Sequence, residues 1–280
     1  MIKTNKEKLP IIPVQAEVTP LCDPPFLGLQ VGENGTGVAM PSAGGICRNF
    51  RVGDRCSDVL GVHIAPGVNI KGAGGSDGAL NCYAGTGTRI KLMGSDQMGY
   101  VIGACSPFTG GILTAAFPKA VIAEMDGNER FLLDCSCCGL SMTDWPDIMC
   151  HIDPELLEKI PLREEDGKLL VPVARVLPER TCGGLGGDIL SIMTTDPDDR
   201  REFSLDDVRF GDFVMFTDID STFGCAYLEG AVTVGVVTDS GAPHVGGGPT
   251  VSVLFSCKTD KLGGYLSDMG NIGRYFEEVE

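Results

Sequence analysis

Histidine and aromatic residues are scarce in this chain. Only His63, His151 and His244 carry an imidazole, and aromatic side chains make up 6% of the residues. Acid–base chemistry near neutral pH therefore has few candidate groups. The sequence also lacks a His-Glu-x-x-His pair, which argues against the commonest zinc proteases.

Basic charge is scarce as well. The chain holds 22 lysines and arginines against 38 aspartates and glutamates, and its net charge of −16 repels polyphosphate backbones and anionic membrane surfaces. We therefore expect neither nucleic acid nor a membrane as a partner.

Long, unbroken hydrophobic segments are missing too. The uncharged stretch from Gln97 to Pro118 contains four glycines and Pro107, which favours a buried β segment with loops over a membrane span. The N-terminus has no apolar core of the kind a secretory signal needs, so a cytoplasmic protein is expected.

Cysteine, in contrast, is plentiful. Twelve cysteines without a secretory signal indicate reduced thiols, which behave as small buried hydrophobic groups. Cys135 and Cys138 form a Cys-x-x-Cys pair with Cys137 between them, but no matching second pair follows. The pattern favours thiols at a strand end over a metal or cluster site.

Glycine and proline determine the expected fold class. The 39 glycines and 17 prolines imply many tight turns between short strands. We predict a mostly β protein, with less than about a fifth of its residues in helix, built as small barrels or sandwiches in two β-rich halves with few short helices. The compositional break between Cys150 and Lys168 suggests a first domain over residues 1–154 and a second over 155–280.

Individual elements can be assigned from turn signals and apolar runs. A β-hairpin is predicted over Ala120–Asp134 around Asp126-Gly127-Asn128. Further strands are expected in four apolar runs, Lys168–Val176, Phe213–Phe216, Ala231–Thr238 and Thr250–Cys257.

The sequence also contains two signals for short helical segments and one recurring turn motif. Asp153 and Pro154 predict a short helix that ends at Ile160, and Ser204 is a candidate cap for a short turn. A Gly-Asp turn recurs in Val52-Gly53-Asp54, Met93-Gly94-Ser95-Asp96 and Phe210-Gly211-Asp212, and we interpret each as a strand entry.

Several segments together resemble the family described as domain of unknown function 4438. In the second half they are Cys138-Gly139-Leu140, Asp144–Asp147, Asp153–Leu157, Val171-Pro172-Val173, Gly183–Gly186, Phe210-Gly211-Asp212, Asp218-Ile219-Asp220, Gly230–Val237 and Gly246–Pro249. In the first half, His63, Pro66-Gly67-Val68 and Gly85-Thr86-Gly87 fit less closely. The resemblance covers most of the chain and implies no activity, because the family has none assigned.

Two departures from the family pattern bear on function. The resemblance implies a histidine in the glycine turn at 246–249, where this chain has Gly247, and a second one near Cys105-Ser106-Pro107. If those histidines act in relatives, this chain has altered or lost their chemistry. The cysteines at 135–138 also lie outside the family pattern.

Asp218 and Asp220 are a candidate metal site. On a regular strand, residues two apart point to one face, where two carboxylates can share a divalent cation such as magnesium, calcium or manganese. The alternative is that both aspartates cap turns through their own side chains.

The glycine-rich segments are candidates for ligand binding. Gly183, Gly184 and Gly186, and likewise Gly246, Gly247 and Gly248, could present backbone N–H groups to an anion, although tight turns are the more common use of such glycines. His63 and His244 lie in loops with glycine and proline, which favours a site over a core position and makes them candidate catalytic groups. The alternative is that each histidine is a structural hydrogen-bonding group.

The sequence thus favours a small-molecule enzyme with its site between the two halves, acting through His63 and His244 and assisted by a divalent cation at Asp218 and Asp220. The alternative is a non-catalytic ligand-binding or assembly protein. A small-molecule partner is expected, and a homo-oligomer is left open.

The cysteine content gives a first testable prediction. All twelve cysteines should be reduced in the native protein, so thiol counting under denaturation without reductant should find about twelve. Missing thiols that prove to be native disulfides would contradict the expected compartment.

Overall fold

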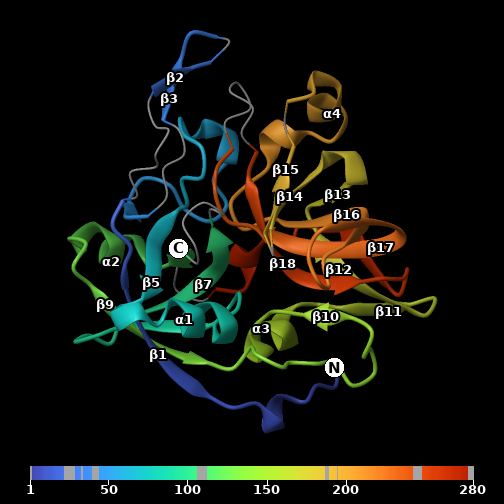
Figure 1. Ribbon diagram of the computed structural model, residues 1–280, viewed down its shortest axis with the longest axis horizontal. Helices are drawn as coiled ribbons and strands as arrows, with labels where there is room; N and C mark the ends of the chain where they lie inside the picture. Colours follow the sequence, from blue (N-terminus) through green and yellow to red (C-terminus); the bar gives the residue numbers. More distant parts are fainter. Residues whose placement is uncertain are drawn as a thin grey trace.

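Two β-rich halves lie side by side in the computed structural model (Figure 1), which describes residues 2–21, 29–32, 34–39, 44–105, 112–186, 189–193, 195–241 and 248–276. The protein is 43% strand and 18% helix. The predicted fold class is therefore confirmed.

The first half contains nine strands and two helices of the described residues. They are β1 (Ile12–Val18), β2 (Leu29–Val31), β3 (Gly37–Ala39), β4 (Ile46–Cys47), β5 (Gly67–Gly72), α1 (Asp77–Tyr83), β6 (Arg89–Leu92), β7 (Met98–Cys105), β8 (Ile112–Ala116), α2 (Lys119–Glu124) and β9 (Arg130–Cys135).

The later elements are β10 (Met149–Cys150), α3 (Pro154–Lys159), β11 (Arg163–Glu165), β12 (Lys168–Val173), β13 (Arg175–Leu177), β14 (Cys182–Gly186), β15 (Ile189–Ile192), α4 (Pro197–Glu202), β16 (Phe213–Asp220), β17 (Ala226–Val237), β18 (Thr250–Cys257) and β19 (Leu262–Leu266). Short 3-10 turns include η2 (Cys56–Asp58), η5 (Leu205–Asp207) and η7 (Ile272–Arg274).

The first half is a closed barrel. Its strands follow the order β1-β9-β6-β7-β8-β5, and β1 also pairs with β5, which joins the two ends of the sheet. A core of residues such as Val14, Ile70, Ile90 and Phe131 fills the interior. All five residues of β8 are buried, because its outer face packs against the second half.

The second half is an open sheet in the order β13-β16-β17-β18-β15-β14, and a smaller sheet, β11-β12-β19, lies beside it. Every residue of β18 is buried, because the chain covers both faces of the large sheet. Apolar runs rich in valine suit such inner strands. The predicted strand Thr250–Cys257 is confirmed with the same bounds.

The two halves share hydrophobic packing. Cys56 and Val59 of the first half pack with Val214 and Phe216 under the large sheet. On the other side, Ile102 of the barrel packs with residues of the second half.

The helix predicted after Asp153 is confirmed. It spans Pro154–Lys159, and the Asp153 carboxylate accepts a hydrogen bond from the Glu155 backbone N–H at 2.9 Å. At Ser204 the expected short turn η5 is present, but Ser204 has a left-handed backbone and makes no side-chain cap, so that part of the prediction is wrong.

The hairpin predicted over Ala120–Asp134 is also wrong in its first arm. Residues Lys119–Glu124 form α2, and only Arg130–Cys135 is a strand. Both edges of β9 are already occupied, by β1 and β6, so no edge is free for another arm.

The uncharged stretch 97–118 contributes β7 and β8, as expected. Across the part of the chain that the structure describes, no helix has the length and apolarity needed to cross a membrane.

Two of the recurring Gly-Asp turns are equivalent in structure and contact each other. In Arg51-Val52-Gly53-Asp54 and in Arg209-Phe210-Gly211-Asp212, the aspartate carboxylate accepts a hydrogen bond from the backbone N–H of the arginine, at 2.8 and 2.9 Å. Both glycines have a positive φ, 94° and 84°. We call these two segments the Arg-x-Gly-Asp turns.

Backbone hydrogen bonds pair the Arg-x-Gly-Asp turns. The Gly53 N–H donates to the Phe210 carbonyl at 2.8 Å, and the Phe210 N–H donates to the Asp54 carbonyl at 3.0 Å. The second turn leads directly into β16, as predicted, whereas the first leads into η2 and is not a strand entry.

The two turn glycines differ in their surroundings, which gives a matched pair of substitutions. A Cβ at Gly211 would lie 2.7 Å from both Val52 Cγ1 and Ile272 Cγ2, whereas a Cβ at Gly53 would meet nothing within 4 Å. Gly53→Ala should cost only the left-handed strain of about 1–2 kcal/mol, and Gly211→Ala about 2–5 kcal/mol, because overpacking is added. Urea unfolding measures both, and equal losses would contradict this packing.

Candidate functional site

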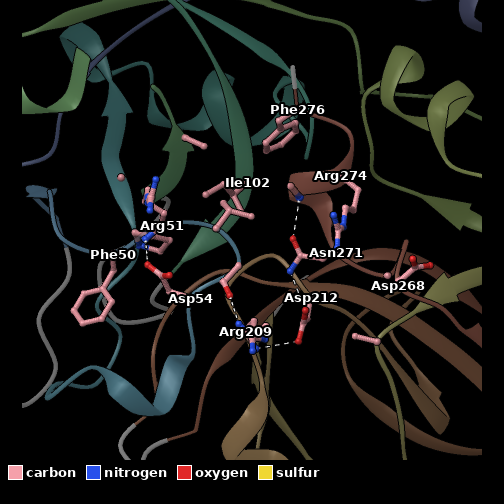
Figure 2. A pocket seen from close by; sticks show the side chains of 18 of the residues that line it. Phe50, Arg51, Asp54, Ile102, Arg209, Asp212, Asp268, Asn271, Arg274 and Phe276 are labelled. Atoms are coloured by element: carbon pink, nitrogen blue, oxygen red, sulfur yellow. Dashed lines mark hydrogen bonds between the residues drawn. The ribbon is translucent and has the colours of Figure 1, made fainter. Parts of the chain in front are cut away.

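A cavity of about 720 Å³ lies between the barrel and the second half. Its walls come from distant parts of the chain: the loop 50–54, strands β5, β7 and β8, the β12–β13 junction, the loop 207–212 and the C-terminal segment 267–276. Figure 2 shows the labelled side chains of both halves around this space.

One wall of the cavity is apolar. Ile102, Phe117 and Ile122 come from the barrel and its helix α2, and Phe50 and Phe276 complete the apolar surface. The Phe276 ring stacks on Tyr100 at a centroid distance of 4.6 Å, and the Phe50 ring packs edge-on against Phe210. These contacts hold both rings in place.

Asp212 and Asn271 form a buried polar floor. Asp212 is 4% exposed, and its carboxylate accepts hydrogen bonds from the Asn271 side-chain amide at 2.8 Å and from the Arg209 N–H. Burial raises the pKa of Asp212 above its ordinary value, although the Asn271 amide, the Arg209 N–H and the charges of Arg175 and Arg209 reduce that rise. The acid therefore gains its proton more readily than a surface aspartate.

Among the described residues, four arginines and no lysine line the cavity. They are Arg51, Arg175, Arg209 and Arg274. Figure 2 shows Arg51, Arg209 and Arg274 on three sides of the space. The Arg209 Nη1 donates to the Gly53 carbonyl at 2.7 Å, and the Arg175 Nε is buried without a hydrogen-bond partner in the described residues.

His63 lies at the contact between the halves, and it is not among the residues that line this cavity. The side chain is 7% exposed, and its Nδ1 lies 3.2 Å from Asp239 Oδ2 and 3.0 Å from Thr250 Oγ1. Burial lowers the pKa of His63, but the charge and hydrogen bond of Asp239 outweigh it and leave the pKa raised. The sequence analysis did not single out Asp239.

His63 thus contacts one carboxylate of the second half, but in the described residues it forms no ion pair with Asp218 or Asp220. His244 lies outside the described residues, and so do Gly246 and Gly247. The approach of His244 to Asp218 and Asp220 therefore stays a prediction.

Gly183, Gly184 and Gly186 lie in strand β14, which pairs with β15, so their interpretation as a tight turn is wrong. Close packing explains them instead, since a Cβ at Gly183 would lie 2.5 Å from Ser191 Oγ. Successive N–H groups of a regular strand point in opposite directions, but β14 has a bulge between Gly184 and Gly186, so the binding role of these glycines stays a prediction. Gly248 packs against the Ile192 carbonyl, where a Cβ would overlap it.

Asp218 and Asp220 do not share one face of β16. A bulge between Thr217 and Ile219 interrupts the alternation, and Asp218 has a φ of 59°. Asp218 Oδ1 accepts a hydrogen bond from the Gly230 N–H at 2.7 Å, and Asp220 Oδ1 accepts one from the Thr222 N–H at 2.9 Å. Among residues the structure describes, no group of three His, Cys, Asp or Glu side chains is placed to hold a metal ion. The geometry favours the turn-cap alternative.

The Cys-x-x-Cys segment follows the end of β9. Cys135 and Cys137 are buried and Cys138 is exposed, and the eleven cysteines of the described residues are all free thiols. Burial raises the pKa of Cys135 and of Cys137 to about 12, so both stay protonated near neutral pH.

A Gly-x-Ser-x-Gly motif, whose expected absence would have argued against the commonest serine hydrolases, does occur in this chain, so that expectation is wrong. Gly74-Gly75-Ser76-Asp77-Gly78 has the Gly-x-Ser-x-Gly spacing and lies between β5 and α1. Ser76 has a φ of −89°, and its hydroxyl donates to the Ala73 carbonyl at 2.7 Å. The strained backbone of a nucleophile elbow is absent at Ser76 itself, and the motif carries no catalytic assignment here.

The residues that line the cavity were not predicted as a site from the sequence. Their strongest signal was the repeated spacing Arg-x-Gly-Asp, of which only the Gly-Asp part was noticed. Nothing local marks Arg175 or Arg274, because only the folded chain brings them beside the other two arginines.

The turn-cap geometry yields a test at the aspartate pair. Replacing Asp218 and Asp220 together by Asn should cost less than about 1 kcal/mol, because the amide oxygen accepts the same hydrogen bonds. Asp218→Ala should cost about 1–2 kcal/mol, because the acceptor is lost at a left-handed position. Thermal unfolding with added magnesium, calcium or manganese should then show equal ion responses in wild type and the double Asn variant. A stabilisation by ions that disappears in the variant would instead establish a metal site.

Comparison with known proteins places the chain in a family. The model of domain of unknown function 4438, N-terminal, matches residues 29–158, and that of its C-terminal part matches residues 159–276. The chain is similar to a solved structure titled "Crystal structure of TM1086", at 28% identity over 99% of each chain and with a TM-score of 0.86. No curated protein matches the chain. The chain belongs to the family of domain of unknown function 4438.

Proposed function

We propose that this protein binds a small organic molecule in the cavity between its two halves. The observation that carries the proposal is the cavity itself, about 720 Å³ in volume, with an apolar wall facing a buried polar floor. Small-molecule sites usually have volumes of roughly 300–1,000 Å³ and combine a largely apolar lining with a few placed polar groups.

The lining supports a ligand with two unlike parts. A ring or hydrocarbon portion would pack against Ile102, Phe117 and Phe276, and a polar portion would lie toward Asp212 and the arginines. Both halves contribute to each part of the lining, so a ligand would stabilise their contact.

An enzyme acting on that molecule is the second candidate. Asp212 favours it, because a buried carboxyl with a raised pKa can exchange a proton nearer to neutral pH. The catalytic role predicted for His63 and His244, the divalent cation, the homo-oligomer and the cytoplasmic location all remain predictions.

Ligand binding can be tested by filling the cavity. Ala174 lines the cavity and is half-buried, and Ala79 of α1 is half-buried elsewhere. Ligands found by native mass spectrometry or a thermal-shift screen should raise the melting temperature of wild type and Ala79→Trp by several degrees, and that of Ala174→Trp much less. Equal shifts in all three proteins would place the ligand elsewhere, and no ligand at all would count against the proposal.

A further inference from the structure

The four arginines of the cavity lining carry many hydrogen-bond donors that the described chain does not use. Each guanidinium carries five N–H donors. The side chains of Arg51, Arg175 and Arg274 form no ion pair with any carboxylate of the described chain. The guanidinium of Arg209 makes one hydrogen bond, to the Gly53 carbonyl. The buried Arg175 Nε is left without a partner there.

Most carboxylates of the lining are already engaged by other groups. Asp54 and Asp212 accept hydrogen bonds from the backbone of their own Arg-x-Gly-Asp turns. Asp207 forms an ion pair with Arg55 at 3.3 Å, and Arg55 does not line the cavity. Asp268, the remaining one, is exposed. The four positive and four negative groups cancel formally, but each carboxylate has a partner in the described chain, whereas the four guanidinium groups together make one hydrogen bond.

We infer that the ligand carries an oxyanion, a carboxylate or a phosphate group, bound by Arg51, Arg209 and Arg274. This inference rests on the proposed function and specifies its ligand class. Guanidinium groups form short, bidentate hydrogen bonds with both oxyanions. Arg51, Arg209 and Arg274 are exposed, so water can satisfy their donors when no ligand is bound. An oxyanion can replace that water with several acceptors at once and also carries the opposite charge, which a neutral or cationic ligand does not.

The Arg-x-Gly-Asp turns explain how two of these arginines are positioned. Each turn bonds its aspartate to the arginine's backbone N–H, so neither guanidinium holds its own turn, although that of Arg209 also donates to the Gly53 carbonyl of the other turn. Since the turns are paired by backbone hydrogen bonds, Arg51 of the first half and Arg209 of the second are fixed relative to each other.

The same geometry makes the arginines suitable for substitution. Arg51→Gln removes no hydrogen bond of the described structure, and Arg209→Gln removes only the bond to Gly53, so both variants should fold. Arg89→Gln is the matched control, because Arg89 pairs with Glu155 and neither residue lines the cavity.

The test compares three probes with one ring and different head groups: phenyl phosphate, benzoate and neutral benzamide. Isothermal titration calorimetry on the full chain should show at least one anion binding tenfold or more tightly than benzamide. Arg51→Gln and Arg209→Gln should each weaken that binding about 10- to 100-fold, and Arg89→Gln should not. The tighter anion distinguishes a phosphate ester from a carboxylate ligand.

Two results would overturn the inference. One is that neither anion binds more tightly than benzamide, and the other is that the arginine variants bind an anion as well as wild type does. If benzamide alone binds and Ala174→Trp abolishes it, ligand binding in the cavity stands and the oxyanion inference fails. If native mass spectrometry and all three probes reveal no ligand, both fail.

Discussion

The pairing of the two Arg-x-Gly-Asp turns is the contact on which the site depends. It joins the loop 50–54 of the first half to the residues that lead into β16. The C-terminal segment is attached at the same place, because the Ile272 N–H donates to the Gly211 carbonyl and the Phe213 N–H to the Gly270 carbonyl, each at 2.8 Å. Three distant parts of the chain thus meet around one cavity, and backbone hydrogen bonds hold them.

The acidic and the basic side chains of the two turns have different roles. The turn aspartates stabilise the backbone, while the arginines of the same turns keep their side chains available. The cavity has no surplus of formal charge, but it has a surplus of donors facing an apolar wall. In the proposed function, that combination selects a ligand by the shape and number of its acceptors, so a chain of net charge −16 could still bind an anion there.

Local patterns in the sequence predicted the local structure well where one physical cause dominates. The strand Thr250–Cys257 follows from an unbroken buried run, and the helix after Asp153 follows from its cap and proline. Prediction failed where tertiary contacts decide: residues 119–124 are helical because β9 has no free edge, and a bulge separates Asp218 from Asp220. The cavity was out of reach, because residues 51, 175, 209 and 274 meet only in the folded chain.

A crystal structure of the protein with saturating phenyl phosphate or benzoate tests the central claim most directly. The account predicts the oxyanion within hydrogen-bond distance of Arg51 and Arg209, with the ring against Phe117 or Phe276 and the two turns still paired. It would be contradicted by an anion bound outside the cavity, or by a cavity without ligand in which the arginines pair with Asp54, Asp212 or Asp268.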